Sequence, residues 1–218
     1  MNRFSKEVLR LFLVRHGETA DNLQMRYLGV RDEPLTDNGA KQARQVAAVL
    51  SELPIGVIIT SPLRRAADTA VQIQRACGVE LRADARLAEG SFGKWDGLTR
   101  SEVLQLGSQD AERLAKWESD PSYAPPGGES FESVRDRMIK LAEQLKDDFE
   151  GASVVLVSHV GPIKALIASA LNIPLQASSR FFLDPGTISV VDWGNPPFLR
   201  LFNSHAHQGW ASARWMKL

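Results

Sequence analysis

The stretch LFLVRHGETADN, Leu11 to Asn22, joins an apolar run directly to Arg15-His16-Gly17. The run belongs to an expected strand, Leu9–Val14, and similar short runs stand at Ile55–Thr60 and Ser153–Ser158. Continuous apolar runs are typical of strands that helices cover on both faces. The sequence therefore predicts a buried sheet in which at least one strand delivers an arginine and a histidine to its end.

Composition and charge restrict the class of protein. The 218 residues include 26 Lys and Arg against 26 Asp and Glu, so no nucleic-acid partner is indicated. Cys77 is the single cysteine, which excludes an intrachain disulfide and favours a reducing compartment. No apolar run reaches the roughly 20 residues that span a bilayer, and the N-terminus lacks the pattern of a signal peptide. We expect a cytoplasmic protein without a membrane partner.

Helical patterns separate the expected strands. One follows Thr36, one follows Pro62, one covers Val134–Phe149, and one begins near Pro162. Near the C-terminus, GTISVVDW and PFLRLFNS flank GNPP, which indicates a hairpin. Strands that alternate with helices predict an α/β fold with a mostly parallel sheet.

The region from about Ser91 to Ser130 breaks this alternation. It is richer in Gly, Trp, Ser and Pro, and we expect one helix in it, from Thr99 to Trp117. Long ordered loops in compact domains are often lids or binding segments. We therefore expect one domain over residues 1–218, with residues 91–130 as a lid insertion. The aromatic residues in this segment either contact substrate or pack the lid on the body: Trp95, Trp117 and Tyr123.

Polar groups follow three of the expected strands. They are Arg15-His16-Gly17, Ser61-Pro62-Leu63-Arg64, and Ser158-His159-Val160-Gly161-Pro162. Because ligands bind beyond the carboxyl ends of parallel strands, two arginines and two histidines would converge on one crevice. Guanidinium groups and a helix N-terminus both bind phosphate oxygens well. The spacing thus points to a phosphoryl group.

Several motifs together resemble the histidine phosphatase superfamily, also called the phosphoglycerate mutase-like family. Beside LFLVRHGETADN, the chain contains in the family's order PLTDNGAKQA, TSPLRRAADTA, RLAEGSFGKWDGLTRSEV, PPGGES and VVLVSHVGPIKAL. This ordered set covers nearly the whole chain, whereas a lone Arg-His-Gly would be a weak signal. The resemblance implies a three-layer α/β/α fold with a mostly parallel central sheet.

The resemblance also implies roles for individual residues. His16 would attack phosphorus and become a phosphohistidine, and Glu89 would be the acid and base. The groups implied to bind the phosphoryl oxygens are Arg15, Asn22, Arg64, His159 and the backbone N–H of Val160. A reference pKa near 6.5 leaves an imidazole substantially neutral at pH 7, as a nucleophile requires. We expect its other nitrogen to donate to a backbone carbonyl near Gly17 and so fix the tautomer.

Some assignments have competitors. Glu18 and Asp96 compete with Glu89 as the acid, and Arg65 competes with Arg64, although the motif favours Arg64. Many family members have His-Gly-Gly where this chain has His159-Val160-Gly161. Val160 keeps a backbone N–H there, but the following proline does not.

The resemblance implies a metal-independent phosphomonoesterase that acts on a small phosphorylated metabolite and needs no cofactor. One alternative is a cofactor-dependent phosphoglycerate mutase, and another is a non-catalytic phosphate-binding scaffold. Mutases tend to have longer chains and a tyrosine after the acid motif, where EGSFGKWDG has Phe92 and Trp95. The phosphatase branch is therefore favoured. His205 and His207 could ligate a metal, but no cysteine or acidic cluster accompanies them in the sequence. An exposed sheet edge leaves a homodimer open.

Overall fold

The computed structural model describes residues 8–210 and residue 213, and it is built around a six-stranded sheet. The strand order is β3-β2-β4-β1-β5-β6. The first four of these strands run parallel, whereas β5 is antiparallel to both of its neighbours, β1 and β6. The predicted α/β fold with a mostly parallel sheet is confirmed, and so is the C-terminal hairpin.

The helices and strands have the following bounds. The strands are β1 Leu9–Arg15, β2 Val57–Thr60, β3 Glu80–Ala83, β4 Ser153–Ser158, β5 Ile188–Trp193 and β6 Phe198–Ser204. The α-helices are α1 Ala20–Leu23, α2 Asp37–Leu50, α3 Arg64–Cys77, α4 Arg100–Gln105, α5 Ser108–Ser119, α6 Phe131–Asp148 and α7 Val160–Ala170. Short 3-10 helices occur at Ala85–Leu87, Gly93–Trp95 and Leu175–Arg180.

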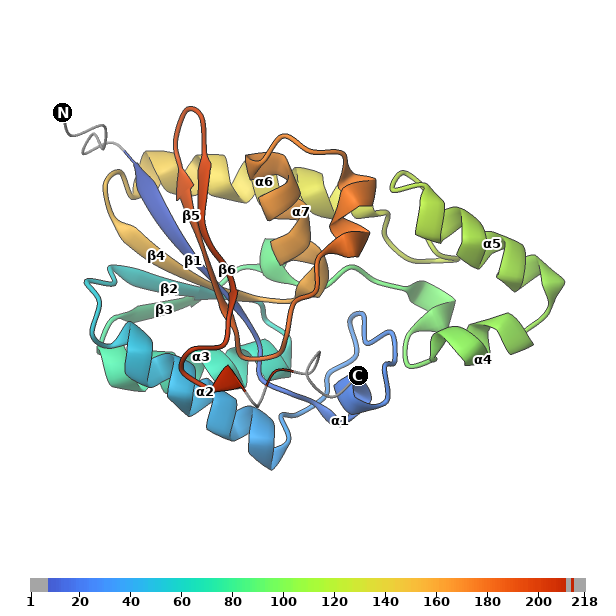
Figure 1. The fold of residues 1–218 in the computed structure, drawn as a ribbon, viewed down its shortest axis with the longest axis horizontal. Helices are drawn as coiled ribbons and strands as arrows, with labels where there is room; N and C mark the ends of the chain where they lie inside the picture. The colour runs from blue at the N-terminus through green and yellow to red at the C-terminus, as the bar shows by residue number, and fades with distance from the viewer. Residues whose placement is uncertain (1–7, 211–212, 214–218) are drawn as a thin grey trace.

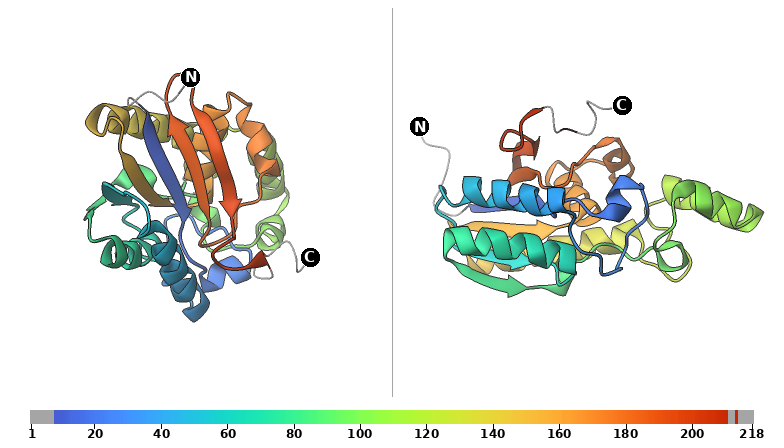
Figure 2. Two further views of the ribbon diagram at one scale, coloured as in Figure 1. Left: turned by 60° about the vertical axis from the view of Figure 1, so that its left-hand side comes forward. Right: turned by 90° about the horizontal axis from the view of Figure 1, so that it is seen from below.

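Helices cover both faces of the sheet, which makes three layers. Figure 1 shows α6 and α7 on one side of the strands and α2 and α3 on the other, and the view from below in Figure 2 agrees. Strand β1 alternates between the two cores, because Leu11 and Leu13 pack with α6 and α7 while Phe12 and Val14 pack with α2 and α3. This double burial explains the continuous apolar run in the sequence.

Two local predictions differ from the structure. The edge strand β3, with sequence ELRA, was not predicted, since its side chains are mostly exposed and carry no apolar pattern. The single helix expected from Thr99 to Trp117 is two helices, because Gly107 between α4 and α5 has a φ of 132°. An L side chain rarely adopts that conformation, so the glycine ends one helix and allows the next to begin.

Residues 91–130 include an arm formed by α4 and α5 that projects beyond the sheet and its flanking helices (Figure 1). The arm has a small core of its own, made by the buried side chains of Trp95, Val103 and Leu114. Tyr27, from the chain after α1, packs against this core with Phe92. Within the described part of the chain, no helix is long and apolar enough to cross a membrane.

Candidate active site

His16 lies immediately after β1, and its ring orientation is fixed by its neighbour. The ring Nδ1 lies 2.7 Å from the carbonyl oxygen of Gly17, as expected from the sequence. A carbonyl oxygen only accepts hydrogen bonds, so Nδ1 carries the ring proton and Nε2 is left with its lone pair. The side chain is 3% exposed. His16 therefore presents an unprotonated Nε2 inside the protein.

The guanidinium beside His16 belongs to Arg65 and not to Arg64. The Nε of Arg65 donates to His16 Nε2 over 3.3 Å, and its terminal nitrogens donate to the carbonyls of Gly29 and Arg31. The Arg64 side chain is 58% exposed and lies 3.5 Å from Asp68 on the outside of α3. The preference for Arg64 is therefore wrong, because the first turn of α3 directs residue 65 inward and residue 64 toward solvent.

Positive charge and burial together keep His16 neutral. Burial lowers the pKa of His16 well below 6.5, and the nearby charges of Arg65 and Arg15 lower it further. Arg15 ends β1, is buried, and donates to the carbonyl of Leu183. The site thus combines a neutral imidazole with two guanidinium groups.

His159 lies at the start of α7 and faces His16. The two ring centroids are 5.0 Å apart, and His159 Nε2 is 2.8 Å from the hydroxyl of Ser61 at the end of β2. Its Nδ1 is buried and has no hydrogen-bond partner among the described residues. Burial lowers the pKa of His159 well below 6.5, with the charge of Arg65 acting in the same direction. Strands β1, β2 and β4 therefore bring His16, Ser61 and His159 together.

Glu89 lies against the first turn of α7. Its carboxylate accepts hydrogen bonds from the backbone N–H groups of Gly90, at 3.0 Å, and Gly161, at 3.3 Å. The hydroxyl of Ser158, at the end of β4, donates to the carbonyl of Leu87 and so holds the segment that carries Glu89. A side chain at position 161 would collide with the carboxylate, since a Cβ there would lie 2.4 Å from Glu89 Oε1.

The two competing carboxylates have other partners. Glu18 accepts a hydrogen bond from the hydroxyl of Thr36, which caps α2, at 2.9 Å. Asp96 accepts from the backbone N–H of Phe92 at 3.0 Å within the arm segment. Of the three candidates, Glu89 is the one held beside α7, the helix that follows His159.

Asn22 and Val160 lie near the ends of two helices. The Asn22 side chain accepts a hydrogen bond from the backbone N–H of Thr19 and completes the cap of α1. Val160 is the first residue of α7, which therefore begins two residues before the predicted Pro162. Val160 and Gly161 both line the pocket described below.

Two glycines allow the loop after β1 to lie close to α2. A Cβ on Gly17 would lie 2.3 Å from the carbonyl oxygen of Gly39, and one on Gly39 would lie 2.1 Å from the carbonyl oxygen of Glu18. The N–H of Gly17 donates to the hydroxyl of Thr69 on α3. The backbone that follows His16 is therefore clamped between α2 and α3.

The C-terminal histidines support the same backbone from the other side. Gly186 N–H donates to the carbonyls of Arg15 and His16, and the Gly186 carbonyl lies 2.7 Å from His207 Nε2. His205 lies 2.9 Å from the Asp184 carboxylate, and both side chains are 3% exposed. Over residues 8–210 and 213, no group of three or more His, Cys, Asp or Glu side chains could hold a metal ion.

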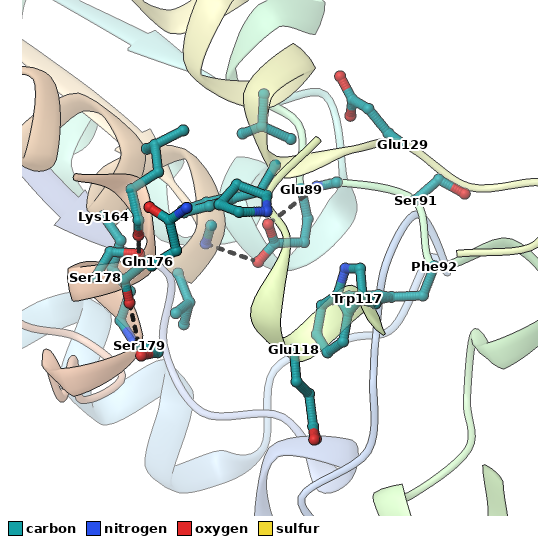
Figure 3. A pocket seen from close by; sticks show the side chains of 17 residues that line it. Glu89, Ser91, Phe92, Trp117, Glu118, Glu129, Lys164, Gln176, Ser178 and Ser179 are labelled. Carbon is teal, nitrogen blue, oxygen red and sulfur yellow. Dashed lines mark hydrogen bonds between the residues drawn. The ribbon is translucent and has the colours of Figure 1, made fainter. Parts of the chain in front are cut away.

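A pocket of about 470 Å³ extends from Glu89 toward the arm. In Figure 3, Lys164, Gln176, Ser178 and Ser179 gather on one side, and Phe92 and Trp117 lie on another, with Glu89 between. The sequence interpretation did not include Lys164, although its place four residues after Val160 puts it on the same face of α7. Trp117 lines the pocket and also packs on Phe92, whereas Trp95 is fully buried in the arm.

Comparison with known proteins finds a matching family and several similar phosphatases. A family model described as the histidine phosphatase superfamily, branch 1, matches residues 11–203. A glucosyl-3-phosphoglycerate phosphatase of Mycolicibacterium vanbaalenii is 40% identical over 210 residues, covering 85% of this chain and 92% of that protein. Phosphoserine phosphatase 1 of Hydrogenobacter thermophilus is 34% identical over 185 residues, covering 84% and 86%.

A solved structure and a longer relative agree with this similarity. The structure of a mycobacterial glucosyl-3-phosphoglycerate phosphatase in complex with VO3 has a TM-score of 0.81 at 33% identity, covering 89% of this chain and 99% of that one. A bifunctional protein of Mycobacterium tuberculosis is 38% identical over 185 residues. The match covers 84% of this chain but only 50% of that relative, so the chain spans about half its length.

Proposed function

Since the chain belongs to the histidine phosphatase superfamily, we propose that it hydrolyses small-molecule phosphomonoesters through a phosphohistidine on His16. The observation that carries the proposal is the state of that ring. Its Nδ1 proton is donated to Gly17, its Nε2 is unprotonated, and its pKa is held well below 6.5 by burial and two arginines. A nucleophilic imidazole needs this combination.

In the first step, the Nε2 lone pair of His16 forms a bond to phosphorus while the bond from phosphorus to the ester oxygen breaks. Glu89, in its protonated form, gives its proton to the departing alkoxide. Charge spreads over the phosphoryl oxygens during this transfer, so fixed positive groups and hydrogen-bond donors lower the barrier. We assign this stabilisation to Arg15, Arg65 and His159.

His159 is suited to this role by its hydrogen-bond pattern. When the Ser61 hydroxyl donates to Nε2, the ring proton of the neutral imidazole resides on Nδ1. That atom is buried beside His16 and has no partner among the described residues, so a phosphoryl oxygen would satisfy it. Asn22 is proposed as a further phosphate-binding amide, with the N–H of Val160.

In the second step, water attacks the phosphohistidine, and Glu89 takes the proton from the attacking water. The bond from phosphorus to Nε2 breaks, and His16 and inorganic phosphate are released. Glu89 is thus an acid in one step and a base in the next, which returns the site to its starting state. No metal ion is required, because the guanidinium groups supply the positive charge.

The first experiment measures phosphate release from p-nitrophenyl phosphate by the wild type and by His16→Ala, each with and without EDTA. We expect wild-type turnover to be unaffected by EDTA. The rate of phosphate release by the variant should be lower by at least about 1,000-fold, since it lacks the nucleophile. Full activity in His16→Ala would overturn the phosphohistidine mechanism. Loss of wild-type activity in EDTA would overturn metal independence.

A second experiment separates the acid from the nucleophile. Glu89→Gln should slow hydrolysis of an alkyl phosphate far more than that of p-nitrophenyl phosphate, because p-nitrophenolate departs without a proton. Equal losses on both esters would point to another acid. Faster interconversion of 2- and 3-phosphoglycerate than release of phosphate would favour the mutase.

The substrate is proposed only as a class, a small phosphorylated metabolite, reached through a pocket that we propose the 91–130 segment covers as a lid. We place the activity in the cytoplasm, in keeping with the single cysteine. A homodimer through an exposed sheet edge stays a prediction, which light scattering would test.

A further inference from the structure

Lys164 is a half-buried cation in the pocket beside Glu89. It lies on the face of α7 that also carries Val160 and Gly161, so its side chain extends from the turn that holds the Glu89 carboxylate. Within the described part of the chain, its ammonium forms no ion pair or hydrogen bond. A half-buried ammonium without a partner is costly, and proteins keep such groups mainly at functional sites.

The other charged groups that line the pocket already have partners. Glu118 receives two hydrogen bonds from Arg100, at 2.7 and 3.0 Å. Glu129 receives two from Arg137, both at 3.0 Å. Glu89 accepts from two backbone N–H groups, as described above. Of the described residues that line the pocket, Lys164 is the one cation, and it forms no ion pair with a carboxylate.

The rest of the lining divides the pocket into two walls. Gln176, Ser178 and Ser179 lie with Lys164 in Figure 3 and offer polar groups. Phe92, Trp117, Phe131, Val134 and Leu175 supply the apolar surface. A ligand that fits this pocket has an apolar or sugar-like body and a charged end that faces α7.

We propose that Lys164 is a specificity residue that binds a carboxylate on the alcohol portion of the phosphomonoester. The inference rests on the proposed function and extends it, because it concerns the leaving alcohol and not the phosphoryl group. One ammonium matches the single charge of a carboxylate. A second phosphate, with nearly two charges, would call for more cations than this wall contains.

The test uses pairs of esters that differ in this one group. In 3-phosphoglycerate a carboxylate stands where glycerol 3-phosphate has a hydroxymethyl group, and phosphoserine has a carboxylate that phosphoethanolamine lacks. We expect the wild type to prefer the carboxylate member of at least one pair by about 10- to 100-fold in kcat/KM, the effect of one charge-assisted hydrogen bond. Lys164→Met should remove that preference, because it lowers kcat/KM for the carboxylate member of the pair more than for the member without a carboxylate.

Two further variants sharpen the result. Lys164→Arg keeps the charge and should retain most of the preference, whereas Lys140→Met, at an exposed position on α6, should change nothing. Thermal unfolding checks that each variant is folded. Equal losses on both members of a pair would overturn the proposal and indicate that Lys164 acts through Glu89. If Lys164→Met lowers kcat/KM more for glycerol 1,3-bisphosphate than for 3-phosphoglycerate, the ligand of Lys164 is a phosphate and the choice of a carboxylate is overturned.

The pH dependence supplies a separate readout. Burial, together with the charge of Arg15 and against the opposing charge of Glu89, lowers the pKa of Lys164 to about 8. Glu118 and Glu129 face the same pocket with their arginine partners. The wild-type preference for the carboxylate ester should therefore decline above about pH 8, where the ammonium loses its proton, and Lys164→Arg should not show the decline. A preference that is constant to pH 9.5 would contradict the assignment.

These outcomes are distinct from failure of the proposed function. If no phosphomonoester is hydrolysed, or if His16→Ala retains activity, the proposed function fails. If p-nitrophenyl phosphate is hydrolysed through His16 but neither ester pair shows a preference, only the assignment of Lys164 fails.

Discussion

Arg64 and Arg65 are neighbours at the start of α3, yet their side chains enter different environments. Arg65 shares a face with the buried Thr69, four residues later, and its guanidinium contacts His16. Arg64 shares its face with Asp68 and stays in solvent. The four-residue spacing from Arg65 to Thr69 and then to Ile73 was present in the sequence and would have identified the inward position.

This difference gives a matched pair of variants. Arg65→Gln should lower kcat/KM for p-nitrophenyl phosphate by about 100- to 1,000-fold, the effect of removing one donor to a developing oxyanion. Arg64→Gln removes an exposed charge and should stay within about twofold. Steady-state kinetics with a thermal unfolding control measures both. Equal losses would contradict the assignment of Arg65.

A methyl group at position 161 should separate stability from catalysis. In Gly161→Ala, the new Cβ would overlap the end of the Glu89 side chain and not the backbone, so the carboxylate would move while the helix stays intact. We expect an unchanged or slightly higher melting temperature, since alanine favours the helical conformation more than glycine does. The kcat/KM for alkyl phosphates should fall by at least about tenfold, because the proton donor is displaced.

The control for this variant is Gly56→Ala. A methyl group there would meet only ordinary contacts, and the position lies before β2, away from Glu89. Its kinetics should match those of the wild type. Wild-type activity in Gly161→Ala would show that the position of the Glu89 carboxylate does not limit the reaction.

At the scale of elements, the buried strands and the C-terminal hairpin were predictable, and the exposed edge strand β3 was not. The expected Ser153–Ser158 strand has the bounds of β4. Both faces of this strand are buried, so its apolar residues follow one another without a break in the sequence. The edge strand β3 gives no such signal, since it pairs on one side with β2 and most of its side chains are exposed. The cap of α2 by Thr36 was also predictable, because capping is a local hydrogen bond.

The arm formed by α4 and α5 should unfold more readily than the sheet. Its core residues Trp95, Val103 and Leu114 form a cluster separate from the two cores that pack on the sheet. Trp95→Ala removes the largest of them and should cost the arm about 3–5 kcal/mol. Hydrogen exchange should then show lost protection across α4 and α5 and retained protection in β1 and β4.

The control for the arm is Trp210→Ala, since that side chain is 66% exposed. It should alter stability by less than about 0.5 kcal/mol. Equal loss of protection in the arm and in the central strands of Trp95→Ala would mean that the two parts unfold as one cooperative unit.

At the scale of the whole molecule, two buried neutral histidines link stability to pH. Burial lowers the pKa values of His16 and His159 well below 6.5, so below that pH the unfolded chain binds protons that the native protein does not. The free energy of unfolding should therefore fall as the pH falls, by up to about 1.4 kcal/mol per pH unit for each histidine. Urea unfolding at pH 7.5, 6.5 and 5.5 measures this slope.

Replacing one of these histidines gives the control. His159→Asn should reduce the slope of the free energy of unfolding against pH between pH 6.5 and pH 5.5, by up to about 1.4 kcal/mol per pH unit. The reason is that one group that binds a proton only in the unfolded chain has been removed. Stability that is constant or rises from pH 7.5 to pH 5.5 in the wild type would contradict the neutral state of both rings.

How much of the site the sequence predicts depends on the range of the contacts. His16 and its bond to Gly17 follow from adjacent residues, and the position of His159 follows from the strand that precedes it. The pocket around Lys164 could not be predicted, since its walls come from the arm, α7 and the residues after α7. Only the packed structure brings these distant parts of the chain together.

The contact between Gly17 and Gly39 has a consequence for mutational tolerance. A side chain at position 17 would collide with the backbone carbonyl of Gly39, and one at position 39 with the backbone carbonyl of Glu18. Because both obstacles are backbone atoms, no rotamer change can relieve a substitution at either position. A saturation library selected for phosphatase activity should return glycine at both positions, and no second-site change in a side chain should restore an alanine. Because the same contact fixes the backbone after His16, we expect positions 17 and 39 to accept only glycine, just as position 16 accepts only histidine for its role as nucleophile.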